Sequence, residues 1–397
     1  MRRGVKFFAK IVLMALKKIH LSPPDVGRLE KKLVKRAITS GWVAPTGPFQ
    51  ERFEKDLAKF CNRQYAVALS SGTAALHLGL IAIGVQKGDY VLCSSMTFVA
   101  TANAISYVGA HPVFIDSERS SGNIDPKVLL EALIYMQKFG MKVGAILPVD
   151  FLGSIANYSE IAPLCQRWNV PMLVDAAESL GSTRGGLPSG SFGVASVFSF
   201  NGNKVLTTSG GGALVTDDPE IARKARFLSS QAREPVLHFE HEEVGFNYRM
   251  SNILASIGVA QLNRLPTMIR ARRKNRARYR RLFSQFSGIR VLGESDQEDN
   301  CWLSAIVVDE FKSGFRPEEL AQFLAVKGIE TRPLWKPMHL QPLYNEARSF
   351  LNGTSESLFQ SGLALPSGSS LTPKDWRRIQ RAILSFLVSR LAQVRVK

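Results

Sequence analysis

The stretch YAVALSSGTAAL, residues 65–76, contains the two kinds of element that decide the fold. Its first half is a short apolar run typical of a buried strand, and its second half opens a helical pattern. Six further apolar runs follow, mostly separated by segments of helix length: DYVLCS (89–94), HPVFID (111–116), VGAILPV (143–149), PMLVD (171–175), ASVFSF (195–200) and GGALVT (211–216). Because several runs are apolar throughout, they predict an α/β domain whose mainly parallel seven-stranded sheet is covered by helices on both faces.

A smaller region follows the predicted sheet. From about Met250 a long helical stretch runs into RARRKNRARYRR (270–281), and a shorter mixed segment comes after it. We therefore expect a large domain over residues 19–250 and a smaller C-terminal α/β domain over residues 251–397. The basic run predicts a solvated helix face and no nucleic-acid partner, because Tyr279 is its only aromatic residue and no nucleic-acid-binding motif accompanies it.

The first 18 residues, MRRGVKFFAKIVLMALKK, form a basic amphipathic extension. Two interpretations stay open. The segment is either an extension upstream of a start at Met14, or a helix that makes weak contact with an anionic membrane surface. Lys10 interrupts the apolar stretch and no small-residue cleavage site follows, so the sequence does not predict a secretory signal. We expect a cytoplasmic protein.

The composition excludes several classes of protein. Lys and Arg total 51 against 33 Asp and Glu, and the resulting net charge of +18 favours anionic partners such as phosphates. The four cysteines are widely separated, which argues against a disulfide scaffold, and the pair His238 and His241 lacks a third ligand, so we expect no metal. Neither a Walker sequence nor a strand-linked GxGxxG is present, so an NTPase or a dinucleotide oxidoreductase lacks support.

Two charged residues near strand ends indicate a cofactor. Asp175 ends the PMLVD run, with Glu178 three residues later, and Lys204 ends SFNGNK (199–204). A carboxylate at a buried strand end needs a cation or a hydrogen-bond partner. Pyridoxal phosphate (PLP) satisfies both groups, with Lys204 forming the Schiff base and Asp175 facing the protonated pyridine nitrogen. Read separately, Lys204 also fits a surface charge, and Asp175 also fits a structural partner.

A phosphate site is expected where SSGTAAL opens a helix. The backbone N–H groups of Gly72 and Thr73, together with the helix dipole, form a site for an anion, and Ser199 adds a hydroxyl. The same turn is also compatible with a plain helix cap.

Eight ordered segments carry a resemblance to one protein family. From about His20 to Thr372, the sequence resembles the DegT/DnrJ-type PLP-dependent sugar aminotransferases of fold type I. The resemblance rests on GWVAPTGPFQERFE, SSGTAAL, TFVATANAI, VDAAESLGS, SFNGNKVLTTSGGGA, GFNYRMSNILASIGVAQL, TRPLWKPMH and LALPSGSSLT. It implies that Lys204 and Asp175 are catalytic, and that Glu178 faces the ring hydroxyl of PLP.

The resemblance also assigns the remaining site residues. Phe98 matches an aromatic residue that stacks on the pyridine ring, and Gly72, Thr73 and Ser199 match phosphate contacts. Asn247 matches a residue that reaches the phosphate of the neighbouring subunit, which implies a homodimer with shared active sites. Arg249 and His339 match positions near the substrate.

The implied reaction moves an amino group from glutamate to a nucleotide-linked keto sugar. The segments HFEHEEVGFNYRM, ETRPLWKPMHLQPLY and LALPSGSSLT look most like those of members that aminate C4 of UDP-4-keto-6-deoxy-N-acetylhexosamines for surface polysaccharide or protein glycosylation. Two departures affect substrate detail: Leu152, Gly153 and Ser154 replace a usual Tyr-Gly-Gln, and Cys301 replaces a common arginine.

Two other functions stay open from the residues. One is a PLP-binding regulator without catalysis, against which an intact set of Lys204, Asp175 and Glu178 argues. The other is a fold type I lyase that acts on an amino acid, for which Arg332 is the candidate that holds the substrate carboxylate.

Overall fold

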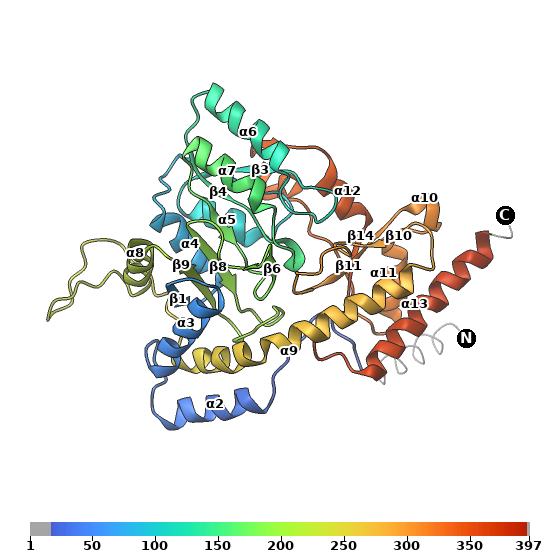
Figure 1. Ribbon diagram of the computed structural model, residues 1–397, viewed down its shortest axis with the longest axis horizontal. Helices are drawn as coiled ribbons and strands as arrows, with labels where there is room; N and C mark the ends of the chain where they lie inside the picture. Colours follow the sequence, from blue (N-terminus) through green and yellow to red (C-terminus); the bar gives the residue numbers. More distant parts are fainter. Residues whose placement is uncertain (1–16, 395–397) are drawn as a thin grey trace, which may run out of the picture.

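The computed structural model describes residues 17–394, and its centre is a twisted sheet (Figure 1). The sheet consists of two four-stranded parts, ordered β1-β9-β8-β5 and β13-β3-β2-β4. Parallel bridges Ile146–Met172 and Val149–Asp175 join β4 to β5. Strand β9 is antiparallel to both of its neighbours, β1 and β8, and the other paired strands described in this sheet are parallel. The strands are β1 (Tyr65–Leu69), β2 (Tyr90–Ser94), β3 (His111–Ile115), β4 (Val143–Leu147), β5 (Leu173–Asp175), β8 (Ala195–Ser199), β9 (Gly212–Thr216) and β13 (Ser349–Phe350).

Helices cover both faces of this sheet, as the apolar runs predict. Along β1, Ala66 and Ala68 belong to one core while Val67 and Leu69 belong to the other, because successive side chains of a strand point to opposite faces. The first core packs against α3 (Pro48–Phe60), α6 (Pro126–Lys138), α7 (Tyr158–Trp168) and α9 (Asn252–Phe283). The second packs against α4 (Gly72–Ala82), α5 (Val99–Tyr107) and α8 (Pro219–Ser229).

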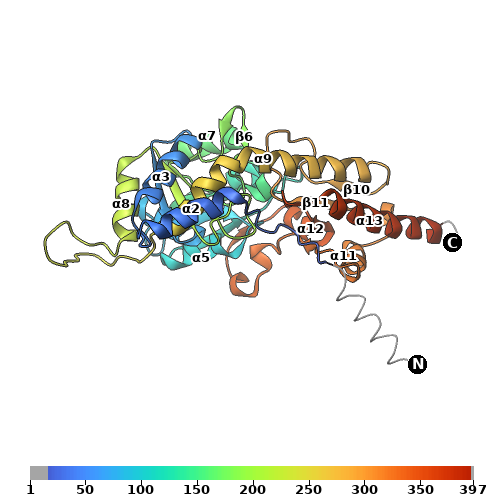
Figure 2. The same cartoon turned by 90° about the horizontal axis from the view of Figure 1, so that it is seen from below.

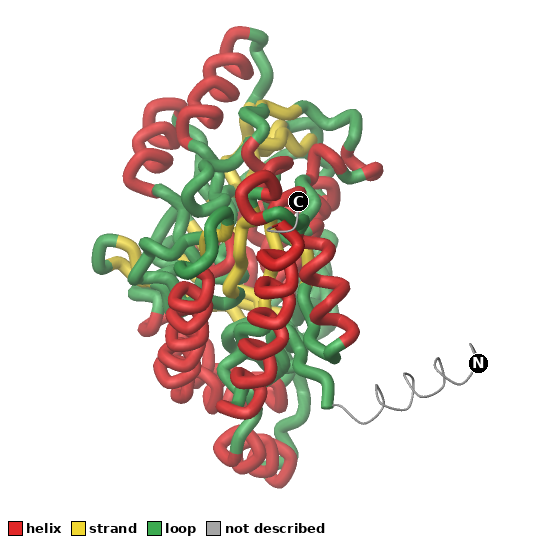
Figure 3. The backbone as a smooth tube through the Cα atoms, turned by 90° about the vertical axis from the view of Figure 1, so that its right-hand side faces the viewer, coloured by secondary structure: helices red, strands yellow, loops and turns green. Residues whose placement is uncertain are grey.

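The C-terminal part has its own sheet and core. An antiparallel sheet of order β10-β11-β14-β12 packs with α11, α13 and the end of α9, and its core includes Tyr279, Ile306 and Ile383. Figure 2 shows this part at one end of the molecule, and Figure 3, seen from that end, shows helices around the strands. Its elements are β10 (Ile289–Val291), β11 (Ser304–Val308), α10 (Glu310–Ser313), α11 (Pro317–Val326), β12 (Arg332–Pro333), α12 (Thr354–Ser361), β14 (Gly362–Leu365) and α13 (Pro373–Val394).

Several contacts tie the two parts together. Helix α9 packs against α2 (Arg28–Thr39) and α3 at its start and against β10 further along, so it runs through both parts (Figure 1). Strand β13, although late in the chain, pairs with β3 of the large sheet, which adds a short strand to the seven expected. Near the start of the described residues, Ile19 bridges Ile329. The division at residues 250 and 251 stays a prediction.

The basic run on α9 is a solvated face only in part. Lys274, Arg280 and Arg281 are exposed, but Arg272 and Arg276 are buried. The buried guanidinium groups bind the segment at 293–302, as described below. The prediction of a solvated helix face was therefore incomplete. A run of basic residues in the sequence does not show which of the side chains will donate hydrogen bonds to backbone carbonyls elsewhere in the chain.

Short elements complete the chain: the hairpin β6 (Thr183–Arg184) and β7 (Leu187–Pro188), and the 3-10 turns η1 (Phe151–Gly153), η2 (Met338–Leu340) and η3 (Pro342–Tyr344). Between residues 17 and 394 we find no helix with both the length and the apolar character needed to cross a bilayer. The expected amphipathic extension lies almost entirely outside the described residues.

Candidate active site

The carboxyl ends of the strands form the wall of a cavity of about 390 Å³. Asp175 ends β5, Lys204 follows β8, and the turn after β1 leads into α4. Loops at this edge of a parallel sheet are where ligands bind in α/β folds. The cavity thus brings together seven of the predicted residues: Gly72, Thr73, Phe98, Asp175, Glu178, Ser199 and Lys204.

Asp175 is buried at the floor of the cavity. Thr101 Oγ1 donates to its Oδ2 at 2.7 Å, and the backbone N–H of Ala177 donates to its Oδ1 at 3.1 Å. Burial raises the pKa of Asp175 above its usual range, and these hydrogen bonds and the charge of Lys204 oppose the shift. The carboxylate is held in one orientation, and a cationic ring nitrogen in the cavity would offset its desolvation.

Lys204 forms an ion pair with the buried Glu178, and the lysine side chain is 12% exposed. The Nζ atom of Lys204 lies 3.4 Å from Glu178 Oε1, and the backbone N–H of Leu152 donates to Glu178 Oε2 at 2.8 Å. Burial raises the pKa of Glu178, and the nearby lysine opposes that shift. The amine therefore points into the cavity rather than into solvent, and the alternative of a surface charge does not hold.

The start of α4 forms a close-packed cradle. Ser71 caps the helix by accepting from the N–H of Ala74 at 3.0 Å. The N–H groups of Gly72 and Thr73, which both line the cavity, have no partner within the helix because they belong to its first turn. A Cβ atom on Gly72 would lie 2.9 Å from Ser199 Cβ, and one on Gly212 would lie 2.4 Å from the carbonyl carbon of Ser71. A side chain at either position would therefore displace the start of α4 from the strands it packs against.

Phe98 stands at the mouth of the cavity. It is the residue before α5 and its side chain is 62% exposed, which leaves its ring free to contact a ligand. A larger cavity of about 1220 Å³ adjoins the first and shares Thr97, Phe98, Asn203 and Trp335 with it. The two cavities offer space for a cofactor and for a larger second molecule.

Three predicted residues lie outside both cavities of the single chain. Asn247 is exposed, and its backbone pairs with that of Ser230. Arg249 points toward Glu54, at a distance of 4.0 Å between Nη2 and Oε1. The side chain of His339 is 6% exposed, with Nδ1 2.6 Å from Ser95 Oγ and Nε2 3.1 Å from Glu356 Oε1. Within one chain it therefore links the residue after β2 to helix α12.

Three cavity residues were missed at the sequence level. Thr101, which holds Asp175, lies three residues after Phe98 at the start of α5, and that helical spacing is a signal that could have found it. Trp302 and Trp335 reach the cavity from the C-terminal part. Neither has a local pattern that separates it from an ordinary core tryptophan.

The residues present fit PLP. They supply a lysine amine, a buried carboxylate oriented by two donors, and a helix start whose glycines leave room for a phosphate. A sequence profile then decides the family, because it matches residues 24–384 and describes the DegT/DnrJ/EryC1/StrS aminotransferases. The chain belongs to this family.

Individual members of the family and solved structures are also similar to this chain. The chain is 44% identical over 373 residues to EpsN of Bacillus subtilis (strain 168), named as a pyridoxal phosphate-dependent aminotransferase, with 93% of this chain and 95% of EpsN covered. It is 35% identical over 376 residues to the GDP-perosamine synthase of Caulobacter vibrioides, with 94% and 99% covered. Among solved structures, Helicobacter pylori PseC, an aminotransferase involved in pseudoaminic acid biosynthesis, superposes with a TM-score of 0.87 at 26% identity over 94% of this chain and all of PseC.

These results confirm a PLP-dependent sugar aminotransferase with the fold type I architecture. They favour that function over the regulator and the amino-acid lyase. Arg332, the lyase candidate, is an exposed residue whose Nη2 lies 3.1 Å from Glu330 Oε1.

Proposed function

We propose that this enzyme transfers an amino group from glutamate to the C4 keto group of a UDP-4-keto-6-deoxy-N-acetylhexosamine, in the cytoplasm, for surface polysaccharide or protein glycosylation. The observation that carries the proposal is the 1220 Å³ cavity that adjoins the cavity of Lys204. Its volume exceeds what an amino acid alone requires and suits a nucleotide-linked sugar.

The chain's own residues have distinct roles. When bound, PLP supplies an electron sink for the breaking C–H bond of the amino donor. Asp175 keeps the proton on the pyridine nitrogen, because its buried carboxylate is stabilised by a positive neighbour. Lys204 moves a proton between the α-carbon of the donor and C4′ of the cofactor. Gly72, Thr73 and Ser199, which line the cavity, would hold the phosphate of PLP, and Phe98 would contact its ring.

The larger cavity has the chemistry that a nucleotide diphosphate needs. Trp335 and Phe98 offer aromatic faces where the two cavities meet. Lys336 lines the same cavity and makes no ion pair with any residue between 17 and 390, so its ammonium group is available for a phosphate. Apolar side chains provide much of the remaining wall, including Leu21, Leu303, Leu334 and Leu343.

The proposal includes a homodimer with shared sites. Residues 233–246 form a long loop that projects from the body of the molecule beside α8 (Figures 1 and 2). Leu237 and Phe239 on this loop are exposed, and Asn247 follows directly after it. Exposed apolar side chains on a projecting loop are stabilised when they pack on a second molecule. A second copy would then bring Asn247 near the phosphate cradle of its neighbour.

Mixing two inactive variants tests the shared site. In a hybrid of Lys204→Ala and Asn247→Asp subunits, one composite site carries both changes and the other carries neither. We expect partial recovery of activity after subunit exchange. Confirmed exchange without recovery would show that Asn247 does not complete the site of the other subunit.

A substrate panel tests the reaction. Purified protein is mixed with PLP, glutamate and a set of UDP-, GDP- and TDP-linked 4-keto sugars, and the products are identified by mass spectrometry. We expect amination of the UDP-4-keto-6-deoxy-N-acetylhexosamine at the highest kcat/KM. Preference for a GDP- or TDP-linked sugar would overturn the choice of nucleotide, and preference for glucose-type sugars without the N-acetyl group would overturn the choice of sugar.

A further inference from the structure

The amine of Lys204 rests against an aromatic face as well as a carboxylate. Its Nζ atom lies 4.1 Å from the centre of the Trp302 ring, on the face of the indole. Glu178 Oε1 lies 3.4 Å from the same Nζ atom and forms an ion pair with it. An ammonium group over an indole is attracted by the ring quadrupole, and the attraction is strongest where water is excluded. Trp302 is 1% exposed, so the contact is shielded from solvent.

Trp302 is itself held rigidly. Its backbone N–H donates to Asn300 Oδ1 at 2.8 Å, and its backbone carbonyl accepts from Nη1 of the buried Arg272 at 2.8 Å. Asn300 Nδ2 also donates to the backbone carbonyl of Glu178 at 2.8 Å, which joins the tryptophan segment to the residue whose carboxylate pairs with Lys204. The side chains of Arg273 and Arg276 bind the backbone of residues 293–299. The ring therefore has a defined position.

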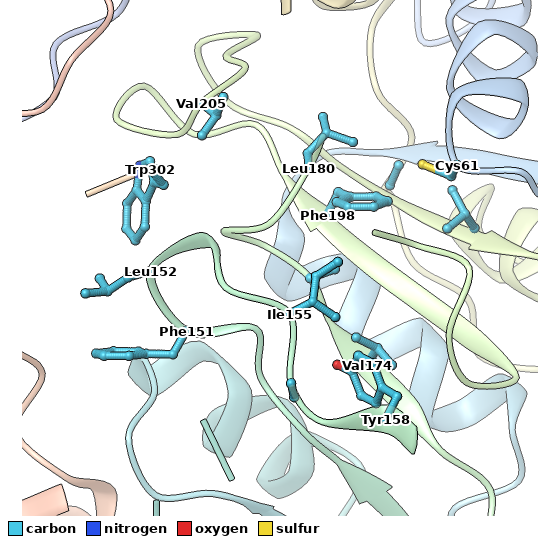
Figure 4. Close-up of a cluster of buried hydrophobic side chains, with 14 of the residues drawn as sticks. Cys61, Phe151, Leu152, Ile155, Tyr158, Val174, Leu180, Phe198, Val205 and Trp302 are labelled. Atoms are coloured by element: carbon cyan, nitrogen blue, oxygen red, sulfur yellow. The ribbon is translucent and has the colours of Figure 1, made fainter. Parts of the chain in front are cut away.

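The same tryptophan also fixes the turn that carries the lysine. The indole Nε1–H donates to the carbonyl of Asn203, the residue before Lys204, at 2.7 Å. Ser22 Oγ donates to the same carbonyl at 2.9 Å. Figure 4 shows Trp302 between the turn that carries Val205 and the segment that carries Leu152. One residue thus contacts both the backbone next to Lys204 and the amine at its tip.

We propose that Trp302 is a positioning residue that holds the Lys204 amine within reach of the cofactor. A lysine side chain has four rotatable bonds, so an unrestrained amine occupies many positions. Holding the amine beside the reacting atom lowers the conformational entropy that must be lost when the reaction occurs. The contact is non-covalent, and before the amine can attack the cofactor its ammonium group must give up a proton, for which Glu178 Oε1 at 3.4 Å is an acceptor within reach. The inference rests on the proposed role of Lys204 and adds to it.

A matched pair of substitutions isolates the aromatic face. Trp302→Phe keeps an aromatic face. Trp302→Met has no aromatic face but is close to phenylalanine in volume, and both variants are smaller than tryptophan and lose the Nε1–H donor. The readout is the rate at which cofactor-free protein captures PLP at Lys204, trapped with borohydride and quantified by peptide mass spectrometry. We expect capture to be roughly tenfold slower in Trp302→Met and within about threefold of wild type in Trp302→Phe. Equal rates in the two variants would overturn the proposal.

A second measurement separates a positioning role from direct contact with the cofactor. In a Lys204→Ala background, PLP binds without a covalent bond, and its dissociation constant is measured by equilibrium dialysis. We expect Trp302→Met to leave this constant unchanged there, because the tryptophan acts through the lysine. Weaker binding in that background would assign Trp302 to the cofactor instead. If wild-type protein shows no capture at Lys204, the proposed role of Lys204 fails first.

Fluorinated tryptophan provides a test that does not require replacing the buried Trp302 by a smaller residue. Incorporation of a polyfluorinated tryptophan at all five tryptophans preserves shape and weakens the attraction for cations. We expect slower capture in wild type and no further slowing in Trp302→Phe. An equal effect of fluorination in both proteins would show that Trp302 is not the ring involved.

Discussion

The substitution Gly72→Ala tests the close packing that shapes the phosphate cradle. The new Cβ atom would lie 2.9 Å from Ser199 Cβ and 3.3 Å from its Cα. Because non-bonded carbon atoms prefer about 3.5–4.0 Å, helix α4 must shift by roughly half an ångström or more. Overpacking of this kind costs about 1–3 kcal/mol of unfolding free energy, and alanine's higher helix propensity offsets at most about 1 kcal/mol.

Two measurements follow from that shift. For a chain of 397 residues, the unfolding entropy per residue converts this cost to a decrease in Tm of about 1–4 °C in cofactor-free protein. Movement of α4 also displaces the N–H groups of Gly72 and Thr73 from the anion, so we expect the dissociation constant of PLP to rise at least about tenfold.

The structure provides a rescue and a control for this experiment. Ser199→Gly removes the atom that the new methyl group meets, so the double variant should recover the Tm lost by Gly72→Ala. Gly202→Ala is the matched control, because its Cβ would meet only Pro24 Cγ, at 3.8 Å. If Gly72→Ala keeps the wild-type Tm and PLP affinity, or if Ser199→Gly fails to restore the Tm, the packing of α4 on β8 does not shape the cradle.

Three further predictions follow from the charged groups. Lys204→Ala should abolish the visible absorbance that borohydride removes and eliminate turnover while the protein stays folded; a trapped peptide without Lys204 would contradict its role. Burial raises the pKa of Asp175 in the folded protein, so its ionised form destabilises the fold once the pH is above the usual carboxyl range. Asp175→Asn should therefore raise the Tm of cofactor-free protein more at pH 8 than at pH 4. A larger increase at pH 4 would refute the direction of the pKa shift. The diphosphate of a UDP-sugar is attracted by the net charge of +18. Between about 0.1 and about 1 M salt, kcat/KM for the keto sugar should therefore fall more than the rate of the half-reaction with glutamate. Equal losses would argue against electrostatic attraction of the nucleotide.

The identity of the site could be predicted because its main residues follow strands. Asp175 and Lys204 each follow an apolar run, and the ends of neighbouring parallel strands meet at one edge of a sheet. The role of Phe98 came from resemblance to the family, since the residue has no distinctive pattern of its own, whereas Ser199 was already expected to add a hydroxyl at the start of the helix that SSGTAAL opens. The structure places both at the cavity.

The sequence by itself determined the strands, the helices on both faces and the cluster of charged residues, because periodicity and strand ends are properties of short segments. Only the tertiary structure decided which distant side chains complete the cavity. Trp302 lies 98 residues after Lys204, and Arg272, which holds it, belongs to a basic run that looks fully solvated in the sequence. Such contacts depend on how α9 and the 293–302 segment pack against the sheet, and packing between distant segments leaves no periodic signal in either one.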